Sequence, residues 1–516
     1  MSSTIHLRTV MSISIGFYLV LAALILGSSL HKTGGKFFYA LDDPYIHLAM
    51  AEQLAHGHYG INAGEASSPS SSILWPFMLV PFAGTSLQVY LPLAWNLLFG
   101  VTSAGLIGAV AAGWPGALES PARTAPWWQQ AVTAILLVLL ANLVSLTFIG
   151  MEHVLQIMLS ICCAIGMIEI MEGRTMPGWC LAAAIFAPMV RYEDLALTVG
   201  VAIGLVGAHQ AKKAATLVAV SILPLVAFSL FLKSLGLPML PTSVLVKGRE
   251  SGSSLFTSVL KGIANLPSNV RHLDRGTMVL LVLILLVFFV RERSRARRFV
   301  IAGAMFVAAS QILIGRFGWF HRYEVYAFIF LGLIVVRLAA GEPKIRFVYV
   351  ALLLLFCAGA FIRASLDPIR GAVEIDQQQY QMHRFVAEFY GHSVAVNDIG
   401  LVSYQRPRGV YILDVFGLAS PEAAGQIDKT APWLAGIVER HGIQMAMLYP
   451  DWFRIPSTWA PLAKMCLDSQ NRYVAEQCVT FYSTSEATKQ ASLLSLQQFA
   501  PTVPRGVDIT FFPPAP

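Results

Sequence analysis

Long apolar runs follow one another from the N-terminus to about Phe361. We count about eleven of them, each roughly 15 to 22 residues long, a length that carries a helix across the hydrocarbon core of a bilayer. Charged residues make up only 13% of the 516 residues, whereas typical soluble domains contain about 25%. The sequence therefore predicts an α-helical polytopic membrane protein with about eleven transmembrane helices.

After about Arg363 the composition becomes that of a soluble protein. Short strand-like runs, including SVAVNDIG, GVYILDVFG, IQMAMLYP and YVAEQCVTFY, are separated by helix-like stretches over residues 377–390 and 432–441. This pattern is typical of a small α/β domain. We therefore predict a transmembrane domain over residues 1–362 and an extracytoplasmic α/β domain over residues 363–516, with its Pro-rich end as an extended arm.

The basic residues indicate which ends of the helices face the cytoplasm. We expect residues 11–29 to form a retained first helix with its N-terminus inside. If residues 73–82 dip into the membrane without crossing it, the basic connections fall on the cytoplasmic side: Arg174, residues 209–213, residues 291–298, Lys344 and Arg346. The first loop at residues 31–88, the loop at residues 233–275 and the C-terminal domain then lie outside. This register predicts a multi-pass protein of the bacterial inner membrane, and it explains the net charge of +7 without nucleic acid.

The positions of the cysteines and the known motifs indicate which kinds of binding site the sequence can form. Four cysteines lie in apolar runs, where small buried thiols are the usual interpretation. Cys466 and Cys478 lie in the C-terminal domain, where they are either free or, outside the cytoplasm, paired as a disulfide. The sequence contains no Walker loop, no dinucleotide glycine fingerprint and no zinc-type Cys/His array. An enzyme at the outer face would therefore need an activated substrate that is already in the membrane.

Two adjacent acids, Asp42 and Asp43, follow the first apolar run. Carboxylates beside low-dielectric surroundings are costly, and one of them often has a raised pKa that suits it to accept a proton. The functional interpretation is a general base that activates a hydroxyl, with Asp43 as its partner or as the ligand of a divalent cation. The structural alternative is a helix N-cap, because Asp-Pro is a favourable start for a helix.

Further ionisable groups are expected on the same face. Glu152 and His153 either complement a helix dipole or belong to the site. Arg191 and Glu193 interrupt an apolar stretch, as a structural charge pair or as a ligand site, and a guanidinium suits phosphate. His321 and Arg322 add cationic donors for an anion or simply reach the interface. Lys247 lies in a loop that solvation alone explains.

The ordered set of motifs resembles the GT-C superfamily of membrane glycosyltransferases. The resemblance rests on LDDPYIHLAMAEQLAHGHYGINAGE followed by SSPSSSILWP, on GMEH, RYED and FHRYEVYAF, and on NDIGLVSYQ with VYILDVFGLASPE in the tail. Relatives often read R-P-E-G where this chain has RYED. The motif order is most similar to the bacterial branch that includes arabinofuranosyltransferases.

The resemblance implies inverting transfer of a hexosyl or pentosyl group from a polyprenyl-phosphate donor to a cell-envelope glycan, lipid or protein. It implies Asp42 as the catalytic base with Asp43 as its partner. Donor phosphate would bind Arg191, His321, Arg322 and Lys247, and further site residues would be Tyr45, His47, Glu152, His153 and Glu193. A divalent cation is an open alternative and no other cofactor is implied. The rival interpretation is a transporter or flippase of a lipid-linked or anionic solute, in which the same charges line a pathway.

Overall fold

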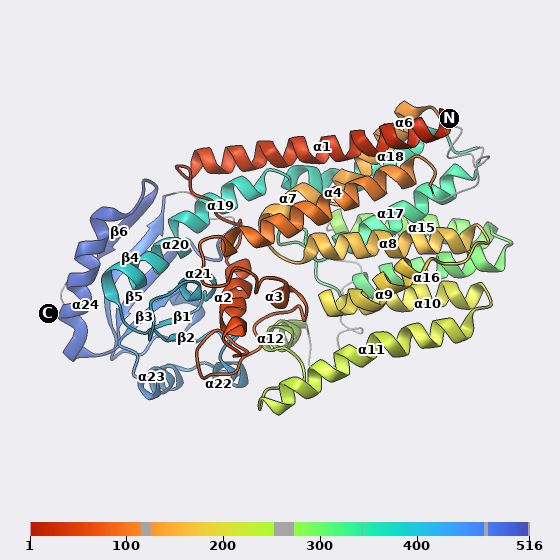
Figure 1. Cartoon of the computed structure of the whole chain (residues 1–516). Helices are drawn as coiled ribbons and strands as arrows, with labels where there is room; N and C mark the ends of the chain where they lie inside the picture. The colour runs from red at the N-terminus through yellow and green to blue at the C-terminus, as the bar shows by residue number, and fades with distance from the viewer. Residues whose placement is uncertain (1, 115–124, 252–272, 343, 469–472, 514–516) are drawn as a thin grey trace.

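The computed structural model describes residues 2–114, 125–251, 273–342, 344–468 and 473–513. Figure 1 shows an elongated molecule in which long helices lie roughly side by side and a small sheet domain, drawn in blue, lies beyond one end of them. The first loop and its short helices, drawn in red, lie between these two parts. This position between the helices and the sheet domain is where the predicted site residues of the first loop lie.

The long helices are apolar. Their bounds are α1 (Ser2–Lys32), α4 (Leu91–Ala111), α6 (Trp127–Leu140), α7 (Leu143–Ile149), α8 (His153–Met171), α9 (Gly178–Val190), α10 (Leu195–Gly207), α11 (Ala211–Ser234), α15 (Leu273–Arg291), α16 (Arg295–Ile314), α17 (Val325–Ala340) and α18 (Phe347–Ala364). Within the described residues, seven helical stretches have the length and apolar composition needed to cross a membrane: His6–Lys32, Gln88–Ala111, Trp127–Ile149, His153–Met171, Ala211–Ser234, Arg295–Ile314 and Phe347–Tyr390. α9 and α17 are shorter apolar helices.

Small residues allow some of these helices to approach closely. A side chain on Gly303 of α16 would collide with the backbone carbonyl of Gly200 in α10. Such small-residue contacts let apolar helices gain van der Waals packing where water supplies no driving force. The segment expected to dip without crossing contains only one turn of helix, α3 (Trp75–Met78).

The basic connections share the end of the helices that is remote from the sheet domain (Figure 1). Arg337 near the end of α17 forms an ion pair with Glu172, which follows α8. Gly207 at the end of α10 packs against Phe299 near the start of α16. Connections that are distant in sequence therefore meet at one end, as the charge pattern requires.

The C-terminal part begins with α19 (Asp367–Gln377), α20 (Gln379–Arg384) and a π-helical turn (Phe385–Tyr390). A sheet of six strands follows, in the order β2-β1-β3-β5-β4-β6. β1 (Val394–Val396) is parallel to β2 (Ile412–Asp414) and to β3 (Met445–Leu448), whereas β5 (Cys478–Ser483), β4 (Ala460–Leu467) and β6 (Val507–Phe511) pair antiparallel. The helices of this part are α21 (Gly400–Ser403), α22 (Pro421–Gly425), α23 (Ala431–Arg440) and α24 (Glu486–Phe499).

Three elements of this domain differ from the sequence analysis. The strand β4 and the helix α24 were not predicted, and the expected extended arm pairs with β4 as the edge strand β6.

Cys466 and Cys478 form a disulfide between the neighbouring strands β4 and β5. The four cysteines of the apolar runs are free and buried, as expected: Cys162, Cys163, Cys180 and Cys357.

Candidate functional site

The first loop delivers its acid pair to the start of α2 (Asp43–Ala55), whose residues from Pro44 to Ala51 are buried. The Asp42 side chain makes no capping hydrogen bond to this helix. Instead, the backbone N–H groups of Gly400 and Leu401 donate to its two carboxylate oxygens, at 2.6 and 2.8 Å. Asp42 therefore joins the first loop to α21 of the sheet domain, because the α21 amides satisfy its carboxylate better than its own helix does.

The surroundings of Asp42 favour its protonated form. Burial, followed by the nearby Asp398 carboxylate, raises the pKa of Asp42 to about 8, although the two backbone N–H groups oppose the shift. Asp398 in turn accepts hydrogen bonds from Tyr449 at 2.6 Å and from Gln379 at 2.9 Å. A carboxylate with such a pKa is a stronger base than an ordinary aspartate once it has lost its proton.

Asp43 points to a different partner. Its Oδ2 lies 2.7 Å from Nη1 of Arg322, and the Arg322 side chain is almost fully buried. Arg322 also donates to the Tyr323 hydroxyl at 3.0 Å and lies 5.0 Å from the centre of the Tyr323 ring. The acid that could have held a divalent cation is thus paired with a guanidinium.

Arg191 is bonded to acids from two segments. Its Nε donates to Glu193 at 2.6 Å, and its Nη1 donates to the fully buried Glu152 at 2.7 Å. Arg191 is placed by a break in the helices, because α9 ends at Val190, Arg191 is extended, and a short 3-10 turn (Tyr192–Asp194) precedes α10. Nη1 also lies 3.4 Å from the Ser71 hydroxyl.

Tyr323 connects these two arginines. The Arg191 guanidinium lies 5.6 Å from the ring centre of Tyr323, and Arg322 lies over the same ring. The His153 ring, at the start of α8, makes a T-shaped contact with the same ring, with 6.3 Å between ring centres. The structure therefore brings four motifs of the sequence together: the first-loop acids, GMEH, RYED and FHRYE.

The remaining predicted residues differ in their surroundings. His47 of α2 is buried, with Nε2 3.9 Å from Glu152, and so belongs to this group. Tyr45 accepts a hydrogen bond from the backbone N–H of Tyr39 at 3.1 Å and its ring packs near Tyr404, which gives it a packing role. Lys247 lies in α12 (Thr242–Ser251), but its side chain is outside the described residues.

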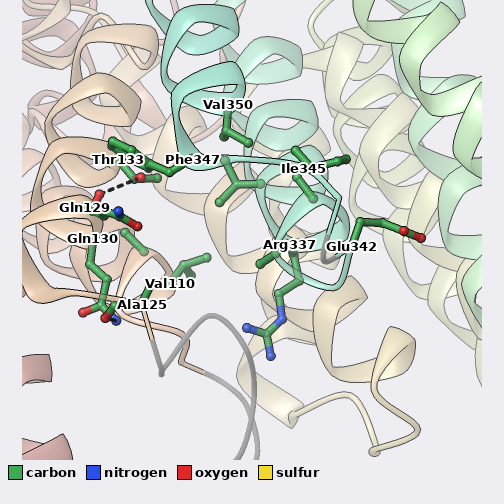
Figure 2. A pocket seen from close by; sticks show the side chains of 14 residues that line it. Val110, Ala125, Gln129, Gln130, Thr133, Arg337, Glu342, Ile345, Phe347 and Val350 are labelled. Carbon is green, nitrogen blue, oxygen red and sulfur yellow. Dashed lines mark hydrogen bonds between the residues drawn. The ribbon is translucent and has the colours of Figure 1, made fainter.

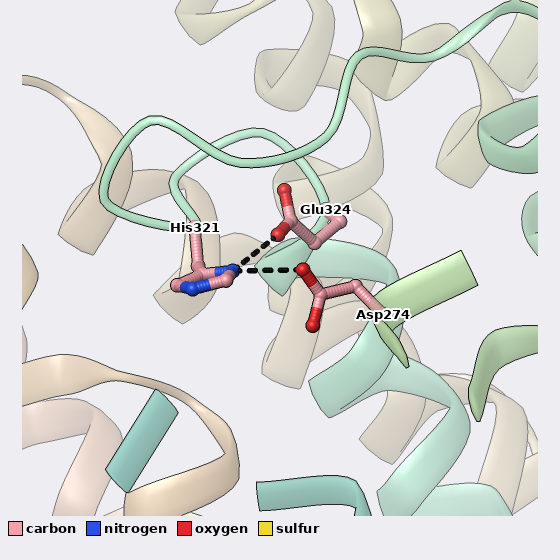
Figure 3. A group of neighbouring side chains, drawn as sticks. All are labelled: Asp274, His321 and Glu324. Carbon is pink, nitrogen blue, oxygen red and sulfur yellow. Dashed lines mark hydrogen bonds and ion pairs between the residues drawn. The ribbon is translucent and has the colours of Figure 1, made fainter. Parts of the chain in front are cut away.

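His321 contacts two acids. Its Nδ1 lies 3.1 Å from Asp274 and 3.0 Å from Glu324, as Figure 3 shows. Burial lowers the pKa of His321, but the hydrogen bonds to Asp274 and Glu324 outweigh burial and raise it to about 10. We expected the positive charge of His321 to bind the donor phosphate, but these two carboxylates already neutralise it.

Sequence reasoning missed several of these residues. Asp398 and Gly400 lie in the NDIG motif that contributed to the resemblance, and Tyr323 lies in FHRYE. Their positions inside these motifs could have identified them as site residues. The serines of SSPSSS were assigned to a polar turn, yet they are buried. Ser68 there bonds Thr242 at the start of α12, with 3.0 Å between the two hydroxyls. No sequence signal pointed to Asp274, which begins a helix far away in the chain.

Two cavities lie away from this cluster. One, of about 240 Å³, is lined by residues of α4, α6, α17 and α18, including Gln130, Thr133 and Arg337 (Figure 2), at the end of the helices remote from the first loop. The other, of about 690 Å³, lies on the sheet domain beside Val246 of α12 and is lined by Phe416 and Trp452 among others. Neither is lined by a predicted catalytic or phosphate-binding residue.

The C-terminal part of the chain is similar to a known family. The model of a domain of unknown function, DUF8728, matches residues 371–482, which run from α19 to β5. No curated protein matches the chain. The match lies within the C-terminal part and does not include the apolar helices or the first loop.

Proposed function

We propose that the protein is a membrane glycosyltransferase of the GT-C type that transfers a sugar from a polyprenyl-phosphate donor to a hydroxyl of a cell-envelope glycan, lipid or protein. The observation that carries the proposal is the position of Arg322. This arginine is buried beside the first-loop acids, and its Nε has no hydrogen-bond acceptor among the residues that the structure describes. A buried N–H group without an acceptor costs free energy that an anionic ligand would recover.

The proposed reaction uses Asp42 as the base. One oxygen of a carboxylate has two lone pairs, so each Asp42 oxygen can accept from the α21 backbone and keep a lone pair for a substrate proton. The acceptor oxygen attacks the anomeric carbon from the face opposite the phosphate and transfers its proton to Asp42. The bond from the anomeric carbon to the phosphate oxygen breaks, and the lipid phosphate leaves with the electron pair.

Arg322 and Arg191 stabilise the leaving phosphate in this scheme. Both guanidinium groups contact the Tyr323 ring, so they need little rearrangement when negative charge develops. Glu152 and Glu193 fix the orientation of Arg191. His321 is not assigned to the phosphate, because Asp274 and Glu324 already compensate its charge.

The proposal includes the membrane arrangement. We infer that eleven helical segments cross the bacterial inner membrane, formed by α1, α4, α6 with α7, α8, α9, α10, α11, α15, α16, α17 and α18. We place the sheet domain outside the cytoplasm, since the disulfide between β4 and β5 is typical of an oxidising compartment. A C-terminal alkaline phosphatase fusion tests this orientation, because the fused enzyme is active only outside the cytoplasm.

Sugar transfer is tested with membranes that contain equal amounts of wild type or Asp42→Asn protein and a panel of labelled polyprenyl-phosphate sugars. Asp508→Asn is the matched control, since it makes the same chemical change at an exposed position on the edge strand β6. We expect transfer by the wild type and by the control, and its loss in Asp42→Asn. Equal transfer by Asp42→Asn would remove the base assignment. If no donor supports transfer, the alternative function as a transporter or flippase would be favoured instead.

A further inference from the structure

Three side chains from two distant segments converge beside the connection between α16 and α17. Asp274 comes from the first turn of α15, whereas His321 and Glu324 come from the connection itself. Their ligand atoms all lie within 4.8 Å of one another (Figure 3). The donor set is one imidazole nitrogen and two carboxylate oxygens, which are all established metal ligands.

The distances from His321 Nδ1 to the two carboxylate oxygens fit a bound metal ion as well as a hydrogen bond. An imidazole Nδ1 carries a single hydrogen, yet two carboxylate oxygens face it at 3.0 and 3.1 Å. Two ligands that each lie about 2.1 Å from a metal ion are about 3.0 Å apart when they bind at a right angle. The two nitrogen–oxygen separations therefore match neighbouring positions around one ion, and three protein ligands would leave further positions for water or a ligand oxygen.

The connection that carries these ligands has an unusual backbone. Gly318, Trp319, Phe320 and His321 all have positive φ angles, of 87°, 47°, 62° and 52°. Each left-handed non-glycine residue costs on the order of 1 kcal/mol or more, so the surrounding contacts must hold the connection in place. Glu324, which is fully buried, contributes by accepting the backbone N–H of Gly318 at 3.1 Å.

We propose that Asp274, His321 and Glu324 form a binding site for one divalent transition-metal ion, of the Mn²⁺ or Zn²⁺ class. Mixed nitrogen and carboxylate ligands favour these ions over Mg²⁺ and Ca²⁺, which prefer oxygen alone. The bound ion links α15 to the strained connection. Arg322, the next residue after His321, is thereby held beside Asp43. The site goes beyond the proposed transfer reaction and does not depend on it.

Metal binding is measured on the purified full-length protein in detergent after chelator treatment and without any sugar donor. Mn²⁺ is titrated in and the electron paramagnetic resonance signal of the free ion is recorded, with excess Mg²⁺ present to suppress weak surface binding. We expect one Mn²⁺ bound per chain, its displacement by Zn²⁺, and a higher unfolding temperature in the presence of the ion.

Asp274→Asn is the principal variant, because Asp274 is partly exposed and asparagine keeps its shape. We expect its affinity for Mn²⁺ to fall at least about tenfold, whereas Asp508→Asn keeps the wild-type affinity. His321→Gln is the second variant, and gel filtration shows whether each variant is folded. A wild type that binds no stoichiometric Mn²⁺ or Zn²⁺, or a folded Asp274→Asn protein with unchanged affinity, would overturn the site. Because no donor is present, either result is independent of the proposed transfer.

Discussion

Replacing Gly400 with alanine tests whether the α21 backbone holds Asp42. A Cβ atom on Gly400 would collide with the backbone carbonyl oxygen of Asp42 and would lie 2.6 Å from its carboxyl carbon, whereas real Cβ atoms essentially never approach a heavy atom within 3.0 Å. Restoring an ordinary contact of about 3.5 Å requires α21 and Asp42 to separate by about 1 Å. The hydrogen bond from Gly400, now 2.6 Å, would lengthen to about 3.6 Å, at which it no longer counts as a hydrogen bond.

The same separation would lengthen the hydrogen bond from Leu401, now 2.8 Å, to about 3.8 Å, so two bonds to Asp42 are lost. A hydrogen bond to a charged group contributes about 1.5–3 kcal/mol, so the pair contributes about 3–6 kcal/mol when Asp42 is ionised. The lower figure applies near neutral pH, where much of Asp42 is protonated. A loss of about 3 kcal/mol raises the local opening equilibrium on the order of 100-fold.

Amide hydrogen exchange in the peptide that contains α21 measures this opening, with the full-length protein in detergent. We expect exchange of the Gly400→Ala protein to be faster by about two orders of magnitude, and sugar transfer to be lost with it. Gly425→Ala is the control, because its new Cβ would meet nothing within 4 Å. Unchanged exchange in Gly400→Ala, or an equal increase in the control, would refute the reasoning.

Four further predictions follow from contacts described above. Transfer should increase with pH through about pH 8, since Asp42 must lose its proton to act, and Asp398→Asn should move the midpoint of the pH–rate profile to lower pH by removing a nearby negative charge. The raised pKa of Asp42 also means that its contribution to stability decreases as pH increases from about 4 to 8, which thermal unfolding at several pH values should detect. Arg191→Gln should lower the free energy of unfolding by about 3–5 kcal/mol, because it removes the arginine that pairs with the buried Glu152. Adding Glu152→Gln should restore part of this free energy, and a double variant whose loss equals the sum of the two single losses would contradict the pairing. Reducing the β4–β5 disulfide should lower the free energy of unfolding by about 3 kcal/mol. Maleimide should label four thiols in the unfolded chain without reductant, and six labelled thiols would exclude the disulfide.

The helical part was accessible from the sequence because each apolar run is a local property. The run that begins at residue 11 lies within the helix Ser2–Lys32, and the break at Arg191 appears where charges interrupt an apolar stretch. Strands that pair with distant partners were harder to predict. β6 reads as a tail in sequence, and only its pairing with β4 makes it part of the sheet.

The sequence by itself determined the apolar helices, the soluble composition after them and the adjacent acids of the first loop. It also led us to expect the first-loop acids and the C-terminal domain on the same side of the helices. These properties depend on neighbours in the chain, through helix length, hydrophobicity and charge.

Only the tertiary structure decided which partner each ionisable group has. Asp42 faces a backbone more than 350 residues away in the chain, Asp43 faces Arg322, and His321 faces Asp274. Each pairing changes what the group can do: one acid becomes a candidate base, one is neutralised by a guanidinium, and one histidine becomes a candidate metal ligand. The physical reason is that the energy of a buried charge depends on the few groups within about 4 Å of it, and those groups come from elsewhere in the chain.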